Sequence, residues 1–316
     1  MLIVSHARPT GGADWYNFYM PVVQRYVRPV RERRKKPLVF IVFAVVIVLI
    51  AAVFFVVRPM IFKDGKQAGG QLQQVEQPAQ AEEKPEMPPL VNLQPVVDEW
   101  LAKQSAEYSI VVYDPANKQI IASNKPDEKY FAASLYKLFV AYLALVDFQN
   151  GTQNPDEELW GGYTRKECVD LMIRESHSPC GEAMMADMGQ ETLRERVSQM
   201  GIENTIFAGI TTTARDSALI LQYIVEGRDL NAENTVFLRN AMRVQPEKYR
   251  RGLPQGAPEA TWDTKVGWNQ EYNYHDVGIM TLPNGREYVV AILSYGNGSP
   301  APIADFAATI YDALKE

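Results

Sequence analysis

The chain has 316 residues, of which 47% are hydrophobic and 22% charged, with a formal net charge of −6 at pH 7. This composition is typical of one or two globular domains with a sizeable core, and the acidic balance argues against nucleic-acid binding by the main part of the chain. The charge is uneven, because residues 1–36 carry eight Lys or Arg against Asp14 and Glu32. A basic head before an acidic body indicates a membrane boundary between them.

Residues 38–57 provide that boundary, as twenty consecutive residues without a charged or polar side chain. A helix of this length rises about 1.5 Å per residue and spans about 30 Å, the thickness of a bilayer hydrocarbon core. The alternatives are a buried core helix or a signal peptide, which usually has a shorter apolar core and a shorter basic lead. We therefore predict an uncleaved transmembrane helix, with the basic segment 1–37 in the cytoplasm and everything after residue 58 outside.

Residues 58–90 are rich in Gln, Pro, Glu, Ala and Gly and predict a disordered linker, followed by a folded domain over 91–316. Strand patterns at both ends of this domain and helical patterns between them predict an α+β fold, with an antiparallel sheet flanked by helices and an all-helical lobe. The cleft between lobe and sheet is the expected site. The predicted elements are a helix over 94–105, strands over 108–113 and 119–123, mostly helical patterns from 134 to about 242 that include 166–174, 181–188, 191–200, 214–225 and 232–242, strands over 261–268, 277–282 and 288–293, and a helix over 302–314.

Ser134 precedes Lys137 by three residues inside an apolar run at 131–141. If the run is helical, the two side chains share a face, so the hydroxyl and the amine come within reach of each other. The residues that follow are apolar on every helical face, which implies burial, and burial lowers the pKa of an amine until it can accept a proton near neutral pH. Ser134 is therefore a candidate nucleophile with Lys137 as its base. Ser-x-x-Lys also occurs by chance in chains of this length, so the other motifs have to decide.

Two further stretches carry groups that a serine–lysine acyl-transfer site needs. Ser-His-Ser at 176–178 follows an apolar helical segment and can present two hydroxyls on a helix-to-helix turn. Lys-Val-Gly at 265–267 lies on a predicted strand, where the cation faces the cleft and the glycine lets substrate backbone approach closely. Taken separately, the first is usually a helix cap and the second a solvated strand face.

In this order the three stretches resemble the signature of serine β-lactamases and penicillin-binding D,D-peptidases, which is Ser-x-x-Lys, then Ser-Asp-Asn, then Lys-Thr-Gly. The resemblance covers about residues 92–316 and includes the Thr-Thr-Thr-Ala-Arg-Asp run at 211–216, Arg-Gly-Leu-Pro at 251–254 and His-Asp at 275–276. It implies a β-lactamase/transpeptidase-like fold and acyl transfer from a strained β-lactam or a D-alanyl peptide to a serine. Neither a metal nor another cofactor is implied.

The resemblance also implies a role for each matching residue. Ser134 corresponds to the acylated nucleophile and Lys137 to its general base. Ser176 corresponds to the hydroxyl that passes a proton to the leaving nitrogen, and Lys265 supplies positive potential to that relay and to the substrate carboxylate. The oxyanion hole would be the backbone N–H groups of Ser134 and Trp268, and Gly267 completes the substrate-binding strand.

The sequence departs from the family pattern at several of these positions. His177 and Ser178 replace an aspartate and a substrate-contacting asparagine, and Val266 replaces a threonine that helps to hold the substrate carboxylate. Ser178 keeps a hydroxyl that can hydrogen-bond, so Ser178, Val266, Gly267 and Trp268 remain the candidate substrate-binding residues. The segment between residues 200 and 213 is too short for the loop that carries the deacylating glutamate in class A β-lactamases. Its only acid is Glu203, for which an exposed charge beside a turn is the ordinary interpretation. Acylation is therefore expected, whereas deacylation should be impaired.

These features predict a membrane-anchored serine hydrolase on the outer face of a bacterial cytoplasmic membrane, which forms an acyl-enzyme with β-lactams and hydrolyses them slowly. One alternative is a D,D-peptidase or penicillin-binding protein that acts on peptidoglycan stem peptides. The other is a catalytically silent sensor domain that binds β-lactams or peptidoglycan, which the changes at Ser178 and Val266 motivate.

The two cysteines, Cys168 and Cys180, flank the 176–178 motif. Outside the membrane a disulfide is chemically allowed and would link the helices that enter and leave this turn. Two buried free thiols are the alternative, because helix geometry decides whether a bridge can form.

A Ser-His-Asp hydrolase is the competing catalytic scheme, with His177 or His275 as the base. The sequence contains no Gly-x-Ser-x-Gly motif, and His6, the third histidine, lies in the predicted cytoplasmic segment. The same shortage of histidines argues against a histidine-based zinc site, and no phosphate-binding glycine loop is present.

Overall fold

The computed structural model describes residues 89–269 and 272–315. The predicted cytoplasmic segment, the predicted transmembrane helix at 38–57 and nearly all of the predicted linker lie outside these ranges. Within them, no helix is both long enough and apolar enough to cross a bilayer.

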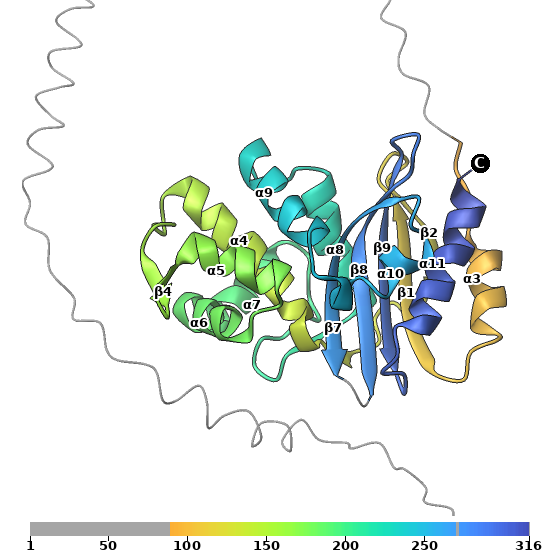
Figure 1. Cartoon of the computed structure of the whole chain (residues 1–316), viewed down its shortest axis with the longest axis horizontal. Helices are drawn as coiled ribbons and strands as arrows, with labels where there is room; N and C mark the ends of the chain where they lie inside the picture. Colours follow the sequence, from red (N-terminus) through yellow and green to blue (C-terminus); the bar gives the residue numbers. More distant parts are fainter. Residues whose placement is uncertain (1–88, 270–271, 316) are drawn as a thin grey trace, which may run out of the picture. The chain divides into compact units, whose positions relative to one another are not determined.

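The described chain contains a five-stranded antiparallel sheet with helices on both of its faces (Figure 1). The strand order β2-β1-β9-β8-β7 places β1 beside β9, so the sheet joins the two ends of the domain, as predicted. The strands are β1 (Glu107–Asp114), β2 (Gln119–Asn124), β7 (Thr261–Asn269), β8 (Asn273–Thr281) and β9 (Glu287–Tyr295).

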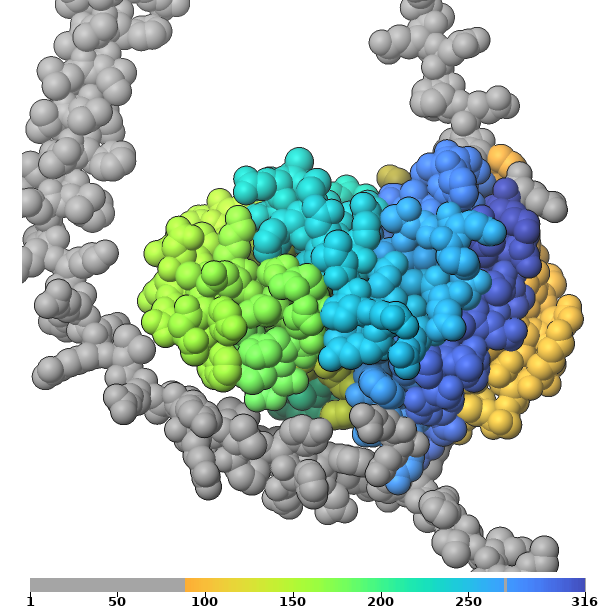
Figure 2. All heavy atoms as spheres, in the orientation of Figure 1, coloured from red at the N-terminus to blue at the C-terminus, as the bar shows by residue number. Residues whose placement is uncertain are grey.

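Strand β9 illustrates how the sheet separates two apolar cores. Its alternate residues Tyr288, Val290 and Ile292 pack in one cluster with helices α3 (Gln94–Leu101) and α11 (Ala301–Leu314). The residues between them face a second cluster, which contains the interior of the helical lobe. Because both faces of the strand are buried, its sequence is almost continuously apolar. Helices α3 and α11, from opposite ends of the described chain, lie side by side on the outer face (Figures 1 and 2).

Helix α4 (Tyr136–Asn150) is the central element of the helical lobe, and the 3₁₀ turn η1 (Ala133–Leu135) leads into it. All ten of its residues from 136 to 145 are buried, which confirms the burial predicted from its apolar sequence. Figure 1 shows the other helices of the lobe around it on the side of the sheet opposite α3 and α11. They are α5 (Arg165–Arg174), α6 (Ser178–Met188), α7 (Gln190–Gln199), α8 (Ala214–Val225) and α9 (Ala232–Arg243).

Several short elements were not predicted, because they have too few residues to show a period. They are β3 (Tyr130–Phe131), which pairs with β6 (Thr211–Thr212), the hairpin of β4 (Glu158–Trp160) and β5 (Tyr163–Thr164), the turn η2 (Glu247–Tyr249) and helix α10 (Leu253–Gly256).

Helix α6 begins at Ser178, three residues before the predicted start at 181. Pro179 in its first turn needs no hydrogen-bond acceptor, and the His177 ring accepts a hydrogen bond from the Cys180 N–H at 3.3 Å. Since His177 is not a common cap, the sequence pattern placed the helix start too late. The earlier start puts Ser178 on the helix itself.

Thr213 and Asp216, at the start of helix α8, have the three-residue spacing of a capping box, but only half of the box forms. The Thr213 hydroxyl accepts the N–H of Asp216 at 3.0 Å, but the Asp216 carboxylate instead accepts the N–H of Asn204 and the hydroxyl of Thr205, both at 2.8 Å. Asp216 therefore ties the segment before β6 to helix α8.

Candidate active site

Ser134 lies in the η1 turn, which three backbone interactions hold in place. The Ala132 N–H donates to the Ile210 carbonyl at 2.9 Å, and the Leu135 N–H donates to the Ala132 carbonyl at 2.9 Å. Strand β7 packs against the same turn, where a Cβ on Gly267 would lie 2.5 Å from the Ala132 oxygen. Gly267 therefore allows close approach as expected, but the backbone that approaches it in this structure belongs to the chain itself.

Lys137 points back toward Ser134 from the first turn of α4, as the spacing of the motif predicted. Its Nζ lies 3.1 Å from the Ser134 Oγ, 3.1 Å from the Ser178 Oγ and 2.7 Å from the Ser176 carbonyl oxygen. The Lys137 side chain is 1% exposed, whereas Ser178 is exposed and Ser134 is partly exposed. A buried amine thus contacts the hydroxyls of two serine residues that are not themselves buried.

Burial governs the ionisation of Lys137. It lowers the pKa of the amine from 10.5 to about 8, although the negative charge of Glu182 acts in the opposite direction. An amine with this pKa is partly deprotonated near neutral pH, which is what a proton acceptor requires.

Ser176 lies between the two lysines of the motifs. The Lys265 Nζ donates to the Ser176 Oγ at 2.9 Å and to the Val266 carbonyl at 2.9 Å, while Lys137 holds the Ser176 carbonyl. Ser176 has a φ of 53°, so a non-glycine residue adopts the left-handed conformation here. The structure therefore brings Ser134, Lys137, Ser176 and Lys265 into one connected cluster.

Lys265 occupies a fully enclosed position on β7. Burial and the nearby charge of Lys137 lower its pKa well below the ordinary value, whereas Asp276 on β8 raises it. Burial raises the pKa of the Asp276 carboxyl to about 8, and its Oδ2 accepts the Leu253 N–H at 2.8 Å. The sheet side of the site thus contains a dehydrated lysine with a carboxyl group behind it.

The three strand residues predicted to bind substrate differ in accessibility. Val266 is 2% exposed and belongs to the core cluster of the outer helices, so its side chain cannot meet a ligand and only its backbone is available. Gly267 faces the η1 turn, as described above. The Trp268 side chain is 40% exposed, and its indole N–H donates to the Gly298 carbonyl at 3.0 Å.

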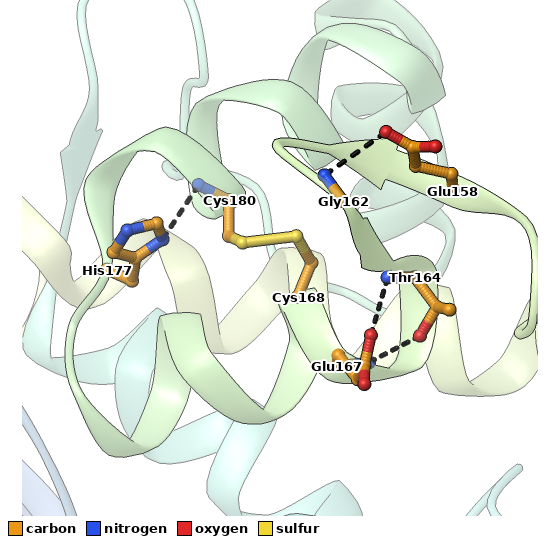
Figure 3. Close-up of a disulfide and its surroundings, with 7 residues drawn as sticks. All are labelled: Glu158, Gly162, Thr164, Glu167, Cys168, His177 and Cys180. Atoms are coloured by element: carbon orange, nitrogen blue, oxygen red, sulfur yellow. Dashed lines mark hydrogen bonds between the residues drawn. A yellow bond between two sulfur atoms is a disulfide. The ribbon is translucent and has the colours of Figure 1, made fainter.

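A disulfide joins Cys168 on α5 to Cys180 on α6, with 5.0 Å between their Cα atoms (Figure 3). Figure 3 also shows His177 bound to the backbone of Cys180 and the complete capping box between Thr164 and Glu167 at the start of α5. The Ser176 turn is thus anchored covalently at the two helices between which it lies.

Neither histidine of the described chain contacts a serine hydroxyl of the cluster. His177 caps α6, and its ring packs edge-on against Trp160, with 5.3 Å between the ring centroids. His275 is fully buried, with one ring nitrogen on the Phe131 carbonyl at 2.9 Å and the other accepting the Ser294 N–H at 3.0 Å. The residues that the structure describes contain no cluster of three or more His, Cys, Asp or Glu able to hold a metal ion.

Glu203 is exposed on the segment between α7 and α8 and makes no ion pair within the described residues. This matches the ordinary interpretation of its charge. The sequence prediction overlooked another acid, Glu182 on α6, whose charge acts on Lys137. Its spacing of four residues from Ser178 was the available signal, but the late start predicted for α6 concealed it.

Comparisons with known proteins agree with this arrangement. The chain belongs to the Beta-lactamase enzyme family, whose Beta-lactamase2 profile matches residues 92–314. A search of curated proteins finds no match.

Among solved structures, PBP-A is 22% identical, with 73% of this chain and 99% of that one covered at a TM-score of 0.65. A PBP-A mutant in an acyl-enzyme complex with penicillin G is 21% identical, with the same fractions of both chains covered and the same TM-score of 0.65. A β-lactamase from Desulfarculus baarsii is 16% identical, with 70% of this chain and 97% of that one covered at a TM-score of 0.64. The chain therefore has the fold of the class A β-lactamases and PBP-A.

Proposed function

We propose that the chain is a serine hydrolase that forms an acyl-enzyme with β-lactams at Ser134 and releases it slowly. The observation that carries the proposal is the position of Lys137, whose buried Nζ lies 3.1 Å from the Ser134 Oγ. This distance permits direct proton transfer, and a pKa lowered to about 8 leaves part of the amine free to accept the proton.

In the proposed reaction, the Ser134 oxygen bonds to the lactam carbonyl carbon while its proton moves to Lys137. Breaking the C–N bond of the ring requires a proton on the leaving nitrogen. Ser176 can donate its hydroxyl proton to this nitrogen and regain one from Lys265, whose Nζ lies 2.9 Å from the Ser176 Oγ. The backbone N–H groups of Ser134 and Trp268 are proposed to stabilise the oxyanion, since β7 packs directly on the η1 turn.

Slow release is proposed because the chain lacks an evident base for water on the segment between α7 and α8. Glu203 is exposed there and, within the described part of the chain, forms no hydrogen bond or ion pair with the serine–lysine cluster. The acyl-enzyme of the PBP-A mutant with penicillin G supports such an intermediate on a similar fold. This feature equally favours the second candidate function, a D,D-peptidase or penicillin-binding protein acting on stem peptides of peptidoglycan.

The test uses the full-length chain and a fluorescent penicillin, with the labelled protein followed on a denaturing gel and by intact mass. We expect a covalent adduct that persists for many minutes and is absent in Ser134→Ala. Ser198→Ala, an exposed serine on α7, is the matched control and should label like the parent protein. Absence of an adduct with any β-lactam or D-alanyl ester would exclude acyl-enzyme formation and favour a silent sensor domain.

Turnover separates the remaining functions. Loss of lactam absorbance supports slow hydrolysis, whereas release of D-alanine from a D-alanyl-D-alanine peptide supports the peptidase. A stable adduct with neither activity supports a penicillin-binding sensor.

We also propose that residues 38–57 anchor the chain in the cytoplasmic membrane, with the hydrolase domain outside. The proposal rests on the uninterrupted apolar sequence and the excess of basic residues before it. The protein should stay with membranes in an alkaline wash, and protease added to spheroplasts should digest the domain while sparing an N-terminal tag.

A further inference from the structure

One face of helix α6 covers the side chain of Lys137. Ser178, Gly181 and Glu182 share this face, because residues three and four apart on a helix are neighbours. The Ser178 hydroxyl contacts the Lys137 Nζ at 3.1 Å, and a Cβ on Gly181 would lie 2.8 Å from the Lys137 Cε. The helix backbone therefore rests directly on the lysine stem.

Glu182 follows Gly181 on this face. Side chains on a helix tend to lean toward its N-terminus and to cover the preceding turn, which here carries Ser178, and the charge of Glu182 reaches the Lys137 amine. Glu182 is partly buried, and within the described ranges it has no hydrogen bond or ion pair with another residue. Its carboxylate is thus available to act on Lys137 through its charge.

The electrostatic effects run in both directions between these two groups. Burial lowers the pKa of Lys137 and the charge of Glu182 raises it, while burial raises the pKa of Glu182 and the charge of Lys137 lowers it. Burial raises the pKa of the hydroxyl of Tyr136, on the same helix as Lys137, and the charge of Glu182 raises it further.

Other charges near the site are engaged elsewhere. On the sheet side, burial lowers the pKa of Lys265, the charge of Lys137 lowers it further, and the charge of Asp276 raises it. Two arginines on the helices beside α4 form ion pairs with other carboxylates. Arg174 at the end of α5 binds Asp170 and Glu175, and Arg196 on α7 binds Asp147 near the far end of α4.

We propose that Glu182 is a positioning residue for the acyl-transfer reaction, whose carboxylate sets how readily Lys137 takes and holds the Ser134 proton. This inference rests on the proposed function. During acylation the O–H bond of Ser134 breaks, its electron pair forms the bond to the carbonyl carbon, and the proton converts the Lys137 amine to an ammonium. The Glu182 charge stabilises that ammonium, at the cost of more protonated lysine in the resting enzyme.

The test is the pH dependence of the acylation rate, measured with the full-length chain and the fluorescent penicillin. In the parent protein the acidic limb reports deprotonation of Lys137, near its pKa of about 8. Glu182→Gln removes the charge and keeps the shape, so we expect the limb to move to lower pH by about 0.5 pH unit or more. Glu182→Ala should move it in the same direction, and Glu182→Asp should leave it near the parent position.

Glu191→Gln, which removes an exposed acid in the first turn of α7, is the control and should leave the limb unchanged. A uniform loss of rate at every pH, with the limb unmoved in both Glu182→Gln and Glu182→Ala, would overturn the inference and leave a structural role. Failure of the parent protein to form any adduct would instead overturn the proposed function, so the two failures are distinguishable. Thermal unfolding of each variant identifies one that does not fold, and Glu182→Ala then provides the measurement in place of Glu182→Gln.

Discussion

Lys137 and Lys265 reach the same residue, Ser176, from opposite halves of the fold, but their surroundings differ. Lys137 comes from a helix, contacts the hydroxyls of two serine residues that are not themselves buried, and has a pKa lowered to about 8. Lys265 comes from the sheet and is fully enclosed, and burial and the charge of Lys137 lower its pKa well below the ordinary value, whereas the charge of Asp276 raises it. Burial and neighbouring charges thus give the same side chain two different tasks. The helical side can exchange a proton near neutral pH, and the sheet side provides a fixed donor.

The largest expected effect comes from removing each amine in turn. Lys137→Met should slow acylation about 10²–10⁴-fold, because the proton acceptor for Ser134 is lost. Lys265→Met should slow it less, about 10–10²-fold, since Ser176 keeps its hydroxyl and loses only a donor. Labelling rates with the fluorescent penicillin measure both. Equal losses would contradict the division of tasks between the two sides.

A smaller effect is expected from a methyl group added at each side of the site. In Gly267→Ala the new Cβ would meet the backbone oxygen of Ala132, and the η1 turn must shift. We expect a loss of about 1–3 kcal/mol in the free energy of unfolding and slower labelling of Ser134.

Gly181→Ala provides the matched comparison, because the nearest atom there is Cε of the Lys137 side chain. The loss of stability should be smaller, with the effect confined to the rate of acylation. Chemical denaturation and labelling of both variants distinguish the two outcomes. If Gly181→Ala lowered the free energy of unfolding more than Gly267→Ala, the expectation would be wrong. The side chain of Lys137 would then be held more rigidly than the backbone of the η1 turn.

The smallest effect concerns the pH dependence of stability on the sheet side. Burial lowers the pKa of His275 to about 4, compared with its ordinary value of 6.5. Below pH 6.5 the unfolded chain binds a proton that the folded chain excludes, so stability falls as the pH drops toward 4. From pH 7 to pH 5 this one group should cost about 2 kcal/mol.

His275→Gln removes this contribution while retaining a polar side chain beside Phe131 and Ser294. Urea unfolding at pH 7 and pH 5 should therefore show a pH-dependent loss that is about 2 kcal/mol smaller in the variant. An identical loss in both proteins would mean that His275 titrates normally in the folded state.

The order of the elements and the meeting of the four motif residues could be predicted from the sequence. Helix α8 was predicted with the same bounds, because its apolar period is regular and Thr213 marks its start. Ser134 and Lys137 lie in contact because their spacing is local, three residues at the entry to a helix. Their meeting with Ser176 and Lys265 is long-range, and only the family resemblance suggested it.

The details that depend on packing could not be predicted. The side chain of Val266 faces the core of α3 and α11 because of the register of an edge strand, which no local pattern specifies. The β4–β5 hairpin is too short to show a period, and Glu182 acts on Lys137 only once α6 starts at Ser178. Gly267 looked like a residue that admits substrate backbone, but which backbone approaches it is decided by tertiary structure.

Three residues around the Ser134 turn adopt a left-handed backbone without being glycine. Ala133 has a φ of 45°, Ser176 of 53° and Ile210 of 51°, and the Ile210 carbonyl holds the N–H of Ala132. Each such residue costs about 1–2 kcal/mol, and for a β-branched side chain the conformation is especially unfavourable. The η1 turn and its neighbours are therefore held by the two apolar cores in a conformation that these residues do not prefer. Weakening either core should release the turn by local unfolding before the sheet itself melts, so activity is the more sensitive indicator of damage to this fold.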